Sequence, residues 1–188
     1  MNDIATLTPP KGWKVLNDSQ KQQFINEHLG GVDDVIAIAV PDGGDGSVFA
    51  QLSYRPAGYV DDNIPIDPTR IRQGISEDLD ILNQESGLTG SEAVRWKSFA
   101  PAPKYDNASR CVEYGVELNI GQDPALNLYK MCLVRNGALV LTLVGKPGDG
   151  LSLQGWRVTP QDSLRYERFD PKSDPRAEGT IILVGMGV

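Results

Sequence analysis

Three aspartates lie close together in the segment GYVDDNIPIDPTR, residues 58–70, where they follow a tyrosine. Clustered carboxylates can serve as general acids, general bases or metal ligands, so Asp61 and Asp62 are the first candidates for chemistry. Asp67 has a simpler role, because an aspartate followed by Pro68 is typical of a helix N-terminus. The segment is therefore either a turn with a helix cap, or an acid–base or metal-assisted hydrolase site at Asp61 and Asp62.

Further catalytic patterns are missing from the sequence. DDNIPID lacks the alternating oxygen ligands and the glycine of a calcium loop. His28 is the only histidine, and its place near the end of a predicted helix favours a structural role. Neither a nucleophile elbow nor a glycine-rich phosphate loop occurs, so we assign no catalytic residue, no metal site and no cofactor. The candidate functional residues are Tyr59, Asp61, Asp62, Tyr105 and Asp106.

The pattern of apolar residues predicts two helices and a series of strands around these candidates. Asn17 opens a short helix that ends before Gly30. After Asp67, apolar residues recur at spacings of four, four and three until Gly87, which predicts a longer amphipathic helix. The predicted strands span residues 35–40, 47–55, 93–100, 109–119, 126–135 and 138–145.

The last of these strands form a predicted antiparallel meander. Asn136-Gly137 is the favoured dipeptide of a two-residue type I′ turn, which pairs Arg135 with Ala138. Apolar residues then lie on both faces of the meander, so we expect helices to cover both faces. We predict one α+β domain over residues 1–188, built on an antiparallel meander sheet between helices.

A loop around Gly121-Gln122 brings the two cysteines of the chain together. A turn centred between these residues places Cys111 opposite Cys132, where Cα atoms are about 4.5 to 5.5 Å apart, a separation that a disulfide accepts. A disulfide would indicate an extracytoplasmic location. Alternatively, both thiols are buried as small apolar residues. The absence of Cys-x-x-Cys spacing argues against a zinc or thiol-redox site.

The composition limits the classes of partner. The formal net charge is −7 and the 18 Lys and Arg residues form no run, so we expect no nucleic-acid binding. No stretch reaches the roughly 18 to 20 consecutive apolar residues of a membrane span. The N-terminus lacks the basic and apolar regions of a signal peptide, which fits a cytoplasmic protein or one whose signal has been removed. Residues 180–188 fit either a last strand or the stub of a membrane anchor.

Several short motifs occur in an order that resembles a known family. They are Gly12-Trp13-Lys14-Val15-Leu16, Gly58-Tyr59-Val60-x-Asp62, Trp96, Pro103-x-Tyr105-Asp106, Leu126-Asn127, Arg135-x-Gly137, Tyr166-x-x-Phe169 and Asp174-x-x-Ala177-x-Gly179. They resemble a bacterial family of predicted membrane-anchored proteins that is catalogued as a domain of unknown function. The resemblance implies a periplasmic or otherwise extracytoplasmic domain that follows a signal peptide and is held at a membrane by a hydrophobic C-terminal anchor. It implies no activity.

We therefore expect a binding or protein-interaction module rather than an enzyme, with an unknown protein or small molecule as its partner. The arrangement of elements also resembles, more loosely, the α/β/α sandwich of the PsbP-like fold, whose members are mostly binding or assembly factors. Two alternatives stay open. One is the hydrolase at Asp61 and Asp62, and the other is a cytoplasmic PsbP-like assembly factor.

Overall fold

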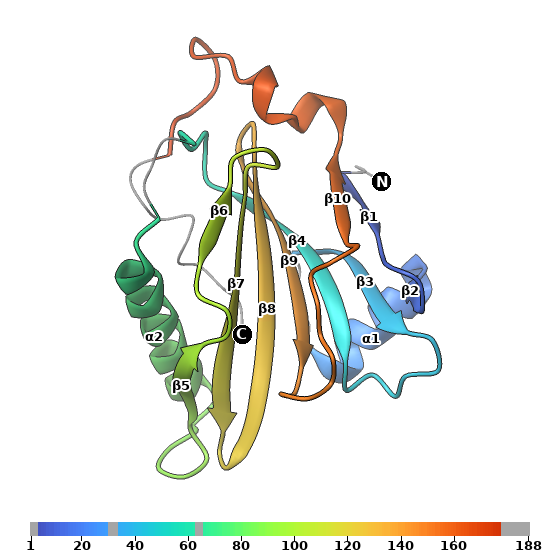
Figure 1. Ribbon diagram of the computed structural model, residues 1–188, viewed down its shortest axis with the longest axis vertical. Coiled ribbons are helices and arrows are strands. Elements are labelled where there is room, and N and C mark those ends of the chain that lie inside the picture. The colour runs from blue at the N-terminus through green and yellow to red at the C-terminus, as the bar shows by residue number, and fades with distance from the viewer. Residues whose placement is uncertain (1–3, 30–33, 63–65, 178–188) are drawn as a thin grey trace.

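Ten strands and two α-helices make up the part of the chain that the computed structural model describes, residues 4–29, 34–62 and 66–177 (Figure 1). The helices are α1 (Asp18–His28) and α2 (Pro68–Glu85). The strands are β1 (Ala5–Thr8), β2 (Trp13–Val15), β3 (Val35–Pro41), β4 (Phe49–Pro56), β5 (Val94–Phe99), β6 (Lys104–Asp106), β7 (Cys111–Ile120), β8 (Asp123–Val134), β9 (Gly137–Gly145) and β10 (Arg157–Pro160). Two 3₁₀ helices, Asp162–Leu164 and Tyr166–Arg168, follow β10. Residues 180–188 lie outside the described part.

The strands form one large antiparallel sheet and one small one. The large sheet has the order β2-β3-β4-β9-β8-β7-β5, and β6 pairs with the same edge of β7 as β5 does. The small sheet consists of β1 and β10. The predicted α+β, sheet-rich fold is confirmed. Four strands were not predicted from the sequence, because each has only three or four residues and periodicity needs a longer run: β1, β2, β6 and β10.

Both helices begin where the sequence predicts. Asn17 forms a capping box with Gln20, in which each side chain bonds the other residue's backbone N–H. Asp67 caps α2 by accepting from the N–H groups of Thr69 and Arg70. The apolar stripe of α2 is buried as expected, and no described helix is long and apolar enough to cross a membrane.

The pairing of β7 with β8 has the predicted register. Cys111 lies opposite Cys132 and Glu113 lies opposite Lys130, with Gly121 and its neighbour Gln122 in the loop between the strands. Gly121 has a φ of 63°, which glycine adopts at little cost. The long β7–β8 hairpin is therefore read correctly from its turn.

The turn predicted at Asn136-Gly137 is wrong, because the observed pairing of β8 with β9 is shifted by two residues from the predicted pairing. Gly137 pairs with Val134, so the loop is Arg135-Asn136, and Ala138 lies opposite Leu133. Neither loop residue has the positive φ that a type I′ turn requires. Gly137 is needed for another reason: a Cβ there would lie 2.0 Å from the carbonyl oxygen of Arg55 in β4. A slip of two residues leaves every side chain on its predicted face.

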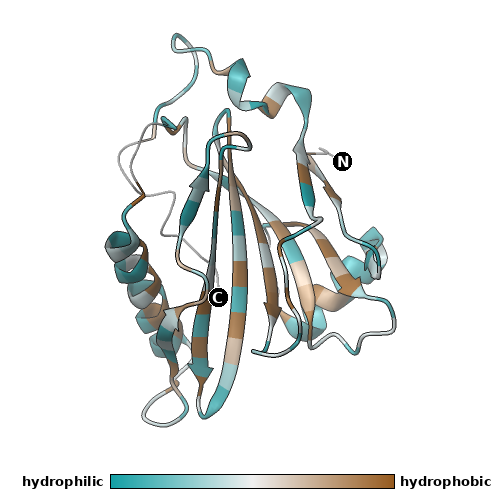
Figure 2. Cartoon of the chain, in the orientation of Figure 1, coloured by the Kyte–Doolittle hydropathy of each residue, from teal (hydrophilic) through white to brown (hydrophobic). Residues whose placement is uncertain are grey.

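The two helices lie on the same face of the large sheet, which corrects the expectation of helices on both faces. On that face α2 covers Val140, and α1 packs near Val144, a residue of the same β9 strand and the same parity. The opposite face carries Leu139, Leu141 and Leu143, and β1, β10 and Trp156 cover it (Figure 1). Hydropathy alternates along the strands (Figure 2). Apolar residues on both faces show only that each face is covered, and here a small sheet covers one.

Gly115 in β7 marks the point where β5 and β6 separate. Its N–H donates to the carbonyl of Pro101 and its carbonyl accepts from Ala100, both at 2.8 Å. A Cβ at this position would lie 1.8 Å from the carbonyl oxygen of Ala100. The connection between β5 and β6 can therefore press against β7 only because this residue has no side chain.

Gly115→Ala is expected to lower the free energy of unfolding by roughly 2 kcal/mol or more, because the Ala100 backbone must move away. Urea denaturation followed by circular dichroism measures the change. Gly44→Ala is the control, since Gly44 lies in an exposed turn and its Cβ would lie 3.3 Å from the nearest atom. We expect the control to change stability by about 0.5 kcal/mol or less. Equal stability of the two variants would contradict the close approach.

Candidate functional site

Three of the five candidate residues lie close together at one end of the large sheet. Tyr59 and Asp62 follow β4, and Tyr105 lies in the short strand β6. Burial raises the pKa of the Tyr105 hydroxyl, while the nearby charges of Asp62 and Arg110 act on it in opposite directions. The Tyr105 hydroxyl is buried and makes no hydrogen bond with a described residue. The structure thus joins two of the sequence segments that were singled out, with Arg110 between them.

Arg110 connects three segments of the chain. Its Nε donates to Oδ2 of Asp62 at 3.3 Å, and its Nη1 donates to the carboxylate of Glu167. Its guanidinium lies 4.8 Å from the centre of the Tyr166 ring, a cation–π contact. Desolvation lowers the pKa of Arg110, but the carboxylates of Glu167 and Asp62 more than offset this and raise it. Asp62 is therefore an ion-pair partner rather than an unpaired acid or base.

Tyr59 lies in a stack of aromatic rings. Its ring centre is 3.7 Å from that of Phe169 and 4.8 Å from that of Tyr166. The Tyr166 hydroxyl donates to the carbonyl of Val60 at 2.9 Å and accepts from the N–H of Asp62 at 3.0 Å. Burial raises the pKa of this hydroxyl well above its usual range. The backbone after β4 is thus held by a residue more than a hundred positions later in the chain.

We call residues 161–177 the C-terminal strap, because they cross the end of the large sheet (Figure 1). Arg135 donates two hydrogen bonds to the carboxylate of Asp174, at 2.7 and 2.8 Å, and this side chain is only 7% exposed. The backbone of Tyr59 bonds to the strap on both sides, accepting from Ala177 and donating to Pro175. A Cβ on Gly58 would lie 2.9 Å from the strap's backbone. Side chains and backbone both hold the strap in place.

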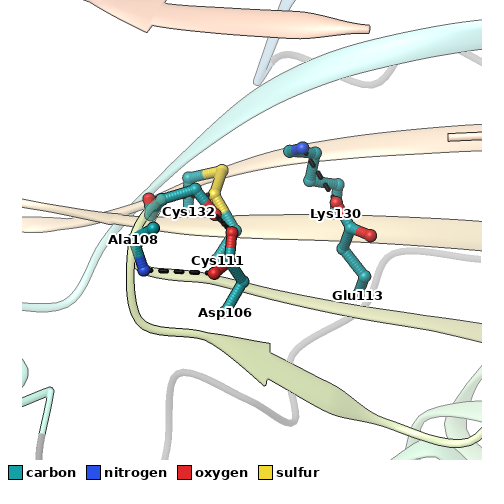
Figure 3. Close-up of a disulfide and its surroundings, with 7 residues drawn as sticks. Asp106, Ala108, Cys111, Glu113, Lys130 and Cys132 are labelled. Atoms are coloured by element: carbon teal, nitrogen blue, oxygen red, sulfur yellow. Dashed lines mark hydrogen bonds and ion pairs between the residues drawn. A yellow bond between two sulfur atoms is a disulfide. The ribbon is translucent and has the colours of Figure 1, made fainter. Parts of the chain in front are cut away.

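Asp106 stabilises the turn that leads to the disulfide (Figure 3). Its carboxylate accepts from the N–H of Ala108 at 3.1 Å and from the hydroxyl of Ser109 at 2.6 Å. The Ser109 hydroxyl, with the backbone N–H of Ala108, lowers the pKa of Asp106. The next strand begins at Cys111, which forms a disulfide with Cys132 across a Cα separation of 4.0 Å. Asp106 therefore has a structural role in this turn.

The remaining candidates do not gather into a catalytic or metal site. Asp61 is exposed next to Asp62, and Asp67 is occupied as the cap of α2. His28 packs against Phe24, with their ring centres 4.4 Å apart. Among the described residues, no three His, Cys, Asp or Glu side chains are grouped so that they could hold a metal ion.

An open groove of about 400 Å³ lies beside this cluster, on the sheet face opposite the helices. The disulfide forms part of its floor, and Trp156 and the strand β10 form part of its wall. Arg110, Arg157 and Arg165 lie on its lining. This groove forms between segments that are distant in the chain, so no local pattern in the sequence predicts it.

The structure also places several motifs whose positions could not be predicted from the sequence. Tyr166, Phe169 and Asp174 belong to the strap, and they meet the motifs at Tyr59 and Arg135 through the contacts described above. The sequence signal for these residues was that they belong to the same ordered set of short motifs. Arg110 had no such signal, since it belongs to none of those motifs.

The fold and the cluster define an α+β domain in which several of the motif residues contact one another at one end of an antiparallel sheet. The chain belongs to the family described as "Protein of unknown function (DUF2167)", which it matches over residues 1–186. The resemblance to a family of unknown function is thereby confirmed. No curated protein and no solved structure matches the chain, so the likeness to the PsbP-like fold stays a prediction.

Arg110→Asn is expected to lower the free energy of unfolding by about 1 to 2 kcal/mol, because the cation–π contact and two ion pairs are lost. Asparagine tolerates the left-handed backbone of this position, where φ is 52°, so the variant tests the side chain alone. Urea denaturation measures the loss. Arg72→Asn, on the exposed side of α2, should cost about 0.5 kcal/mol or less. An Arg110→Asn variant as stable as the control would show that Arg110 does not hold the segments together.

The contact of Asp174 with Arg135 should make the strap sensitive to acid. Hydrogen bonds from Arg135 lower the pKa of Asp174 below its ordinary value of 3.8. A carboxylate whose folded pKa is lowered contributes stability above its unfolded pKa and loses it as the pH falls through the folded pKa. The Arg135 amide donates to Leu164 of the strap, so its protection factor, the intrinsic exchange rate at each pH divided by the observed rate, should fall below about pH 4.

Asp174→Asn tests this acid sensitivity. In the variant, the protection factor of the Arg135 amide should already be lower at neutral pH and should change less between pH 5 and pH 2 than in the unmodified protein. Asp80→Asn, on the exposed side of α2, should keep the original pH profile. The acid sensitivity is wrongly assigned to Asp174 if both variants keep the original pH profile.

Proposed function

We propose that this chain is an extracytoplasmic domain that binds another protein and is tethered to a membrane in its native form. The observation that carries the proposal is the disulfide between Cys111 and Cys132. Both cysteine residues are buried, with exposures of 2% and 9%. Disulfides persist in oxidising compartments and are rare in the cytosol of most organisms, so a paired thiol at this position supports an extracytoplasmic location.

The roles of the motif residues support a binding domain more than an enzyme. Asp62 is paired with Arg110, Asp106 stabilises a turn, and Tyr59 is stacked against the strap. A general acid or base needs a perturbed pKa and access to substrate. These residues instead use their polar and aromatic groups in contacts that shape one end of the sheet.

Two alternatives have less support. A hydrolase at Asp61 and Asp62 would need their carboxylates to converge on a substrate, whereas Asp62 faces the guanidinium of Arg110. A cytoplasmic assembly factor of PsbP-like type would need both cysteines to be reduced thiols in the cell. No specific contact in the described residues favours either alternative.

Thiol trapping in native cells tests the proposed location. Cells are quenched in acid and alkylated before and after reduction, and mass spectrometry of the chain records which cysteines react. We expect Cys111 and Cys132 to react only after reduction, and the full-length protein to fractionate with membranes. The matched control is Cys132→Ser, in which Cys111 has lost its partner and should react without reduction when the protein is unfolded.

The proposed location would be overturned by free thiols in the unmodified protein together with a cytoplasmic fractionation. Activity assays address the other half of the proposal. Asp62→Asn should leave any hydrolysis by the purified chain unchanged, whereas a hydrolase at this loop would lose it.

A further inference from the structure

One edge of β10 has no strand partner in the described part of the chain. The N–H of Gln161 donates to the carbonyl of Ile4, so by the alternation of antiparallel pairing Thr159 also exchanges its hydrogen bonds with β1. Val158, between them, must then direct its N–H and its carbonyl away from β1. Pro160 has the same orientation, which fits its lack of an N–H. No hydrogen bond joins the backbone groups of Val158 to another described residue.

The groove described above runs along this free edge. All four residues of β10, Arg157–Pro160, line it. Successive strand residues point to opposite sides, so a groove that met only one side of β10 would touch every second residue. Contact with all four indicates that the groove follows the backbone edge. Its floor is the face of β8 that carries Lys130 and Cys132, which extend to the same side of the strand (Figure 3).

The lining of the groove is cationic although the whole chain is acidic. Arg110, Lys130, Arg157 and Arg165 line it with Glu167 as the one carboxylate, whereas the formal net charge of the chain is −7. Three of the cations have acidic partners on the protein. Arg157 is exposed on β10 and forms no ion pair with a described residue. A negatively charged occupant would therefore find at least one exposed arginine without a described ion pair on the strand that carries the free backbone groups.

From this geometry we infer that the groove binds an extended, acidic peptide segment of a partner protein, which adds to β10 as a third strand of the small sheet. Val158 supplies one N–H and one carbonyl, and Arg157 with its neighbouring cations binds the acidic side chains. Strand addition of this kind obtains affinity from main-chain hydrogen bonds and specificity from side-chain contacts. A volume of about 400 Å³ lies within the range of ligand pockets. The inference rests on the proposed binding function and names the class of its partner.

A capped six-residue peptide of alternating valine and glutamate is the probe. Titration of the full chain, followed by ¹⁵N NMR and calorimetry, should show saturable binding, with shifts at Val158 and slower exchange of its amide. A peptide with lysine in place of glutamate should bind at least about fivefold more weakly. A probe whose backbone amides are N-methylated along one edge should bind about tenfold more weakly, because it cannot form the ladder.

Two variants separate the backbone and charge contributions. Val158→Pro removes the N–H that faces the groove and leaves the bonds to β1 intact, so affinity should fall about tenfold. Arg157→Glu should weaken binding at least about fivefold. Arg72→Glu makes the same change in net charge on the exposed side of α2 and should leave the affinity within about twofold. Circular dichroism tests whether each variant is folded. If Val158→Pro does not fold, the affinity of Arg157→Glu for the acidic peptide decides whether the inference holds.

The inference is overturned if the folded chain shows no saturable binding of the acidic peptide at millimolar concentration. It is also overturned if the N-methylated peptide binds equally well, or if succinate alone produces the same shifts, since the groove would then recognise a free anion. These outcomes leave the proposed location intact, because thiol trapping in cells tests that separately.

Discussion

The register of β7 against β8 is the constraint on which most of this structure depends. It places Tyr114 and Tyr129 on the helix side, where their rings stack 5.0 Å apart, and it places the cysteines on the other side. A slip of one residue would exchange the two sides along the whole hairpin. It would also separate the sulfur atoms and remove Arg110 from the end of the sheet. The packing of the core, the disulfide and the contacts of Arg110 therefore all depend on the pairing of β7 with β8.

Local patterns in the sequence predicted this register because a loop centre and an alternating strand are short-range features. They also predicted both helices, since an N-cap and an apolar stripe are encoded within a few turns. The hairpin turn after β8 was misplaced because Gly137 serves a distant strand rather than its own turn. Tertiary contacts overrode local turn preference there.

Less of the candidate site than of the fold could be predicted from the sequence. Asp62 could be selected from the sequence as one of several clustered carboxylates, and Tyr59 and Tyr105 as members of the ordered motifs. The roles of these residues could not be predicted in the same way. Those roles depend on Arg110 and on the strap, which both lie more than forty residues after Asp62 in the chain. No periodicity or spacing rule relates such distant residues. The covering of the second sheet face by β1 and β10 was unpredictable for the same reason, as strands of four residues carry little pattern.

Gly115 gives the large sheet a divided outer edge. Because β5 and β6 both pair with β7 and separate at this glycine, the edge consists of one strand of six residues and one of three, with a register shift at Trp96 and Ser98 in the longer strand. Neither piece offers a long, flat row of unpaired backbone groups to a second copy of the chain. Lys97 adds a charge to the longer piece. The single missing side chain that lets the connection approach β7 thus also protects a strand-rich protein against uncontrolled edge-to-edge aggregation.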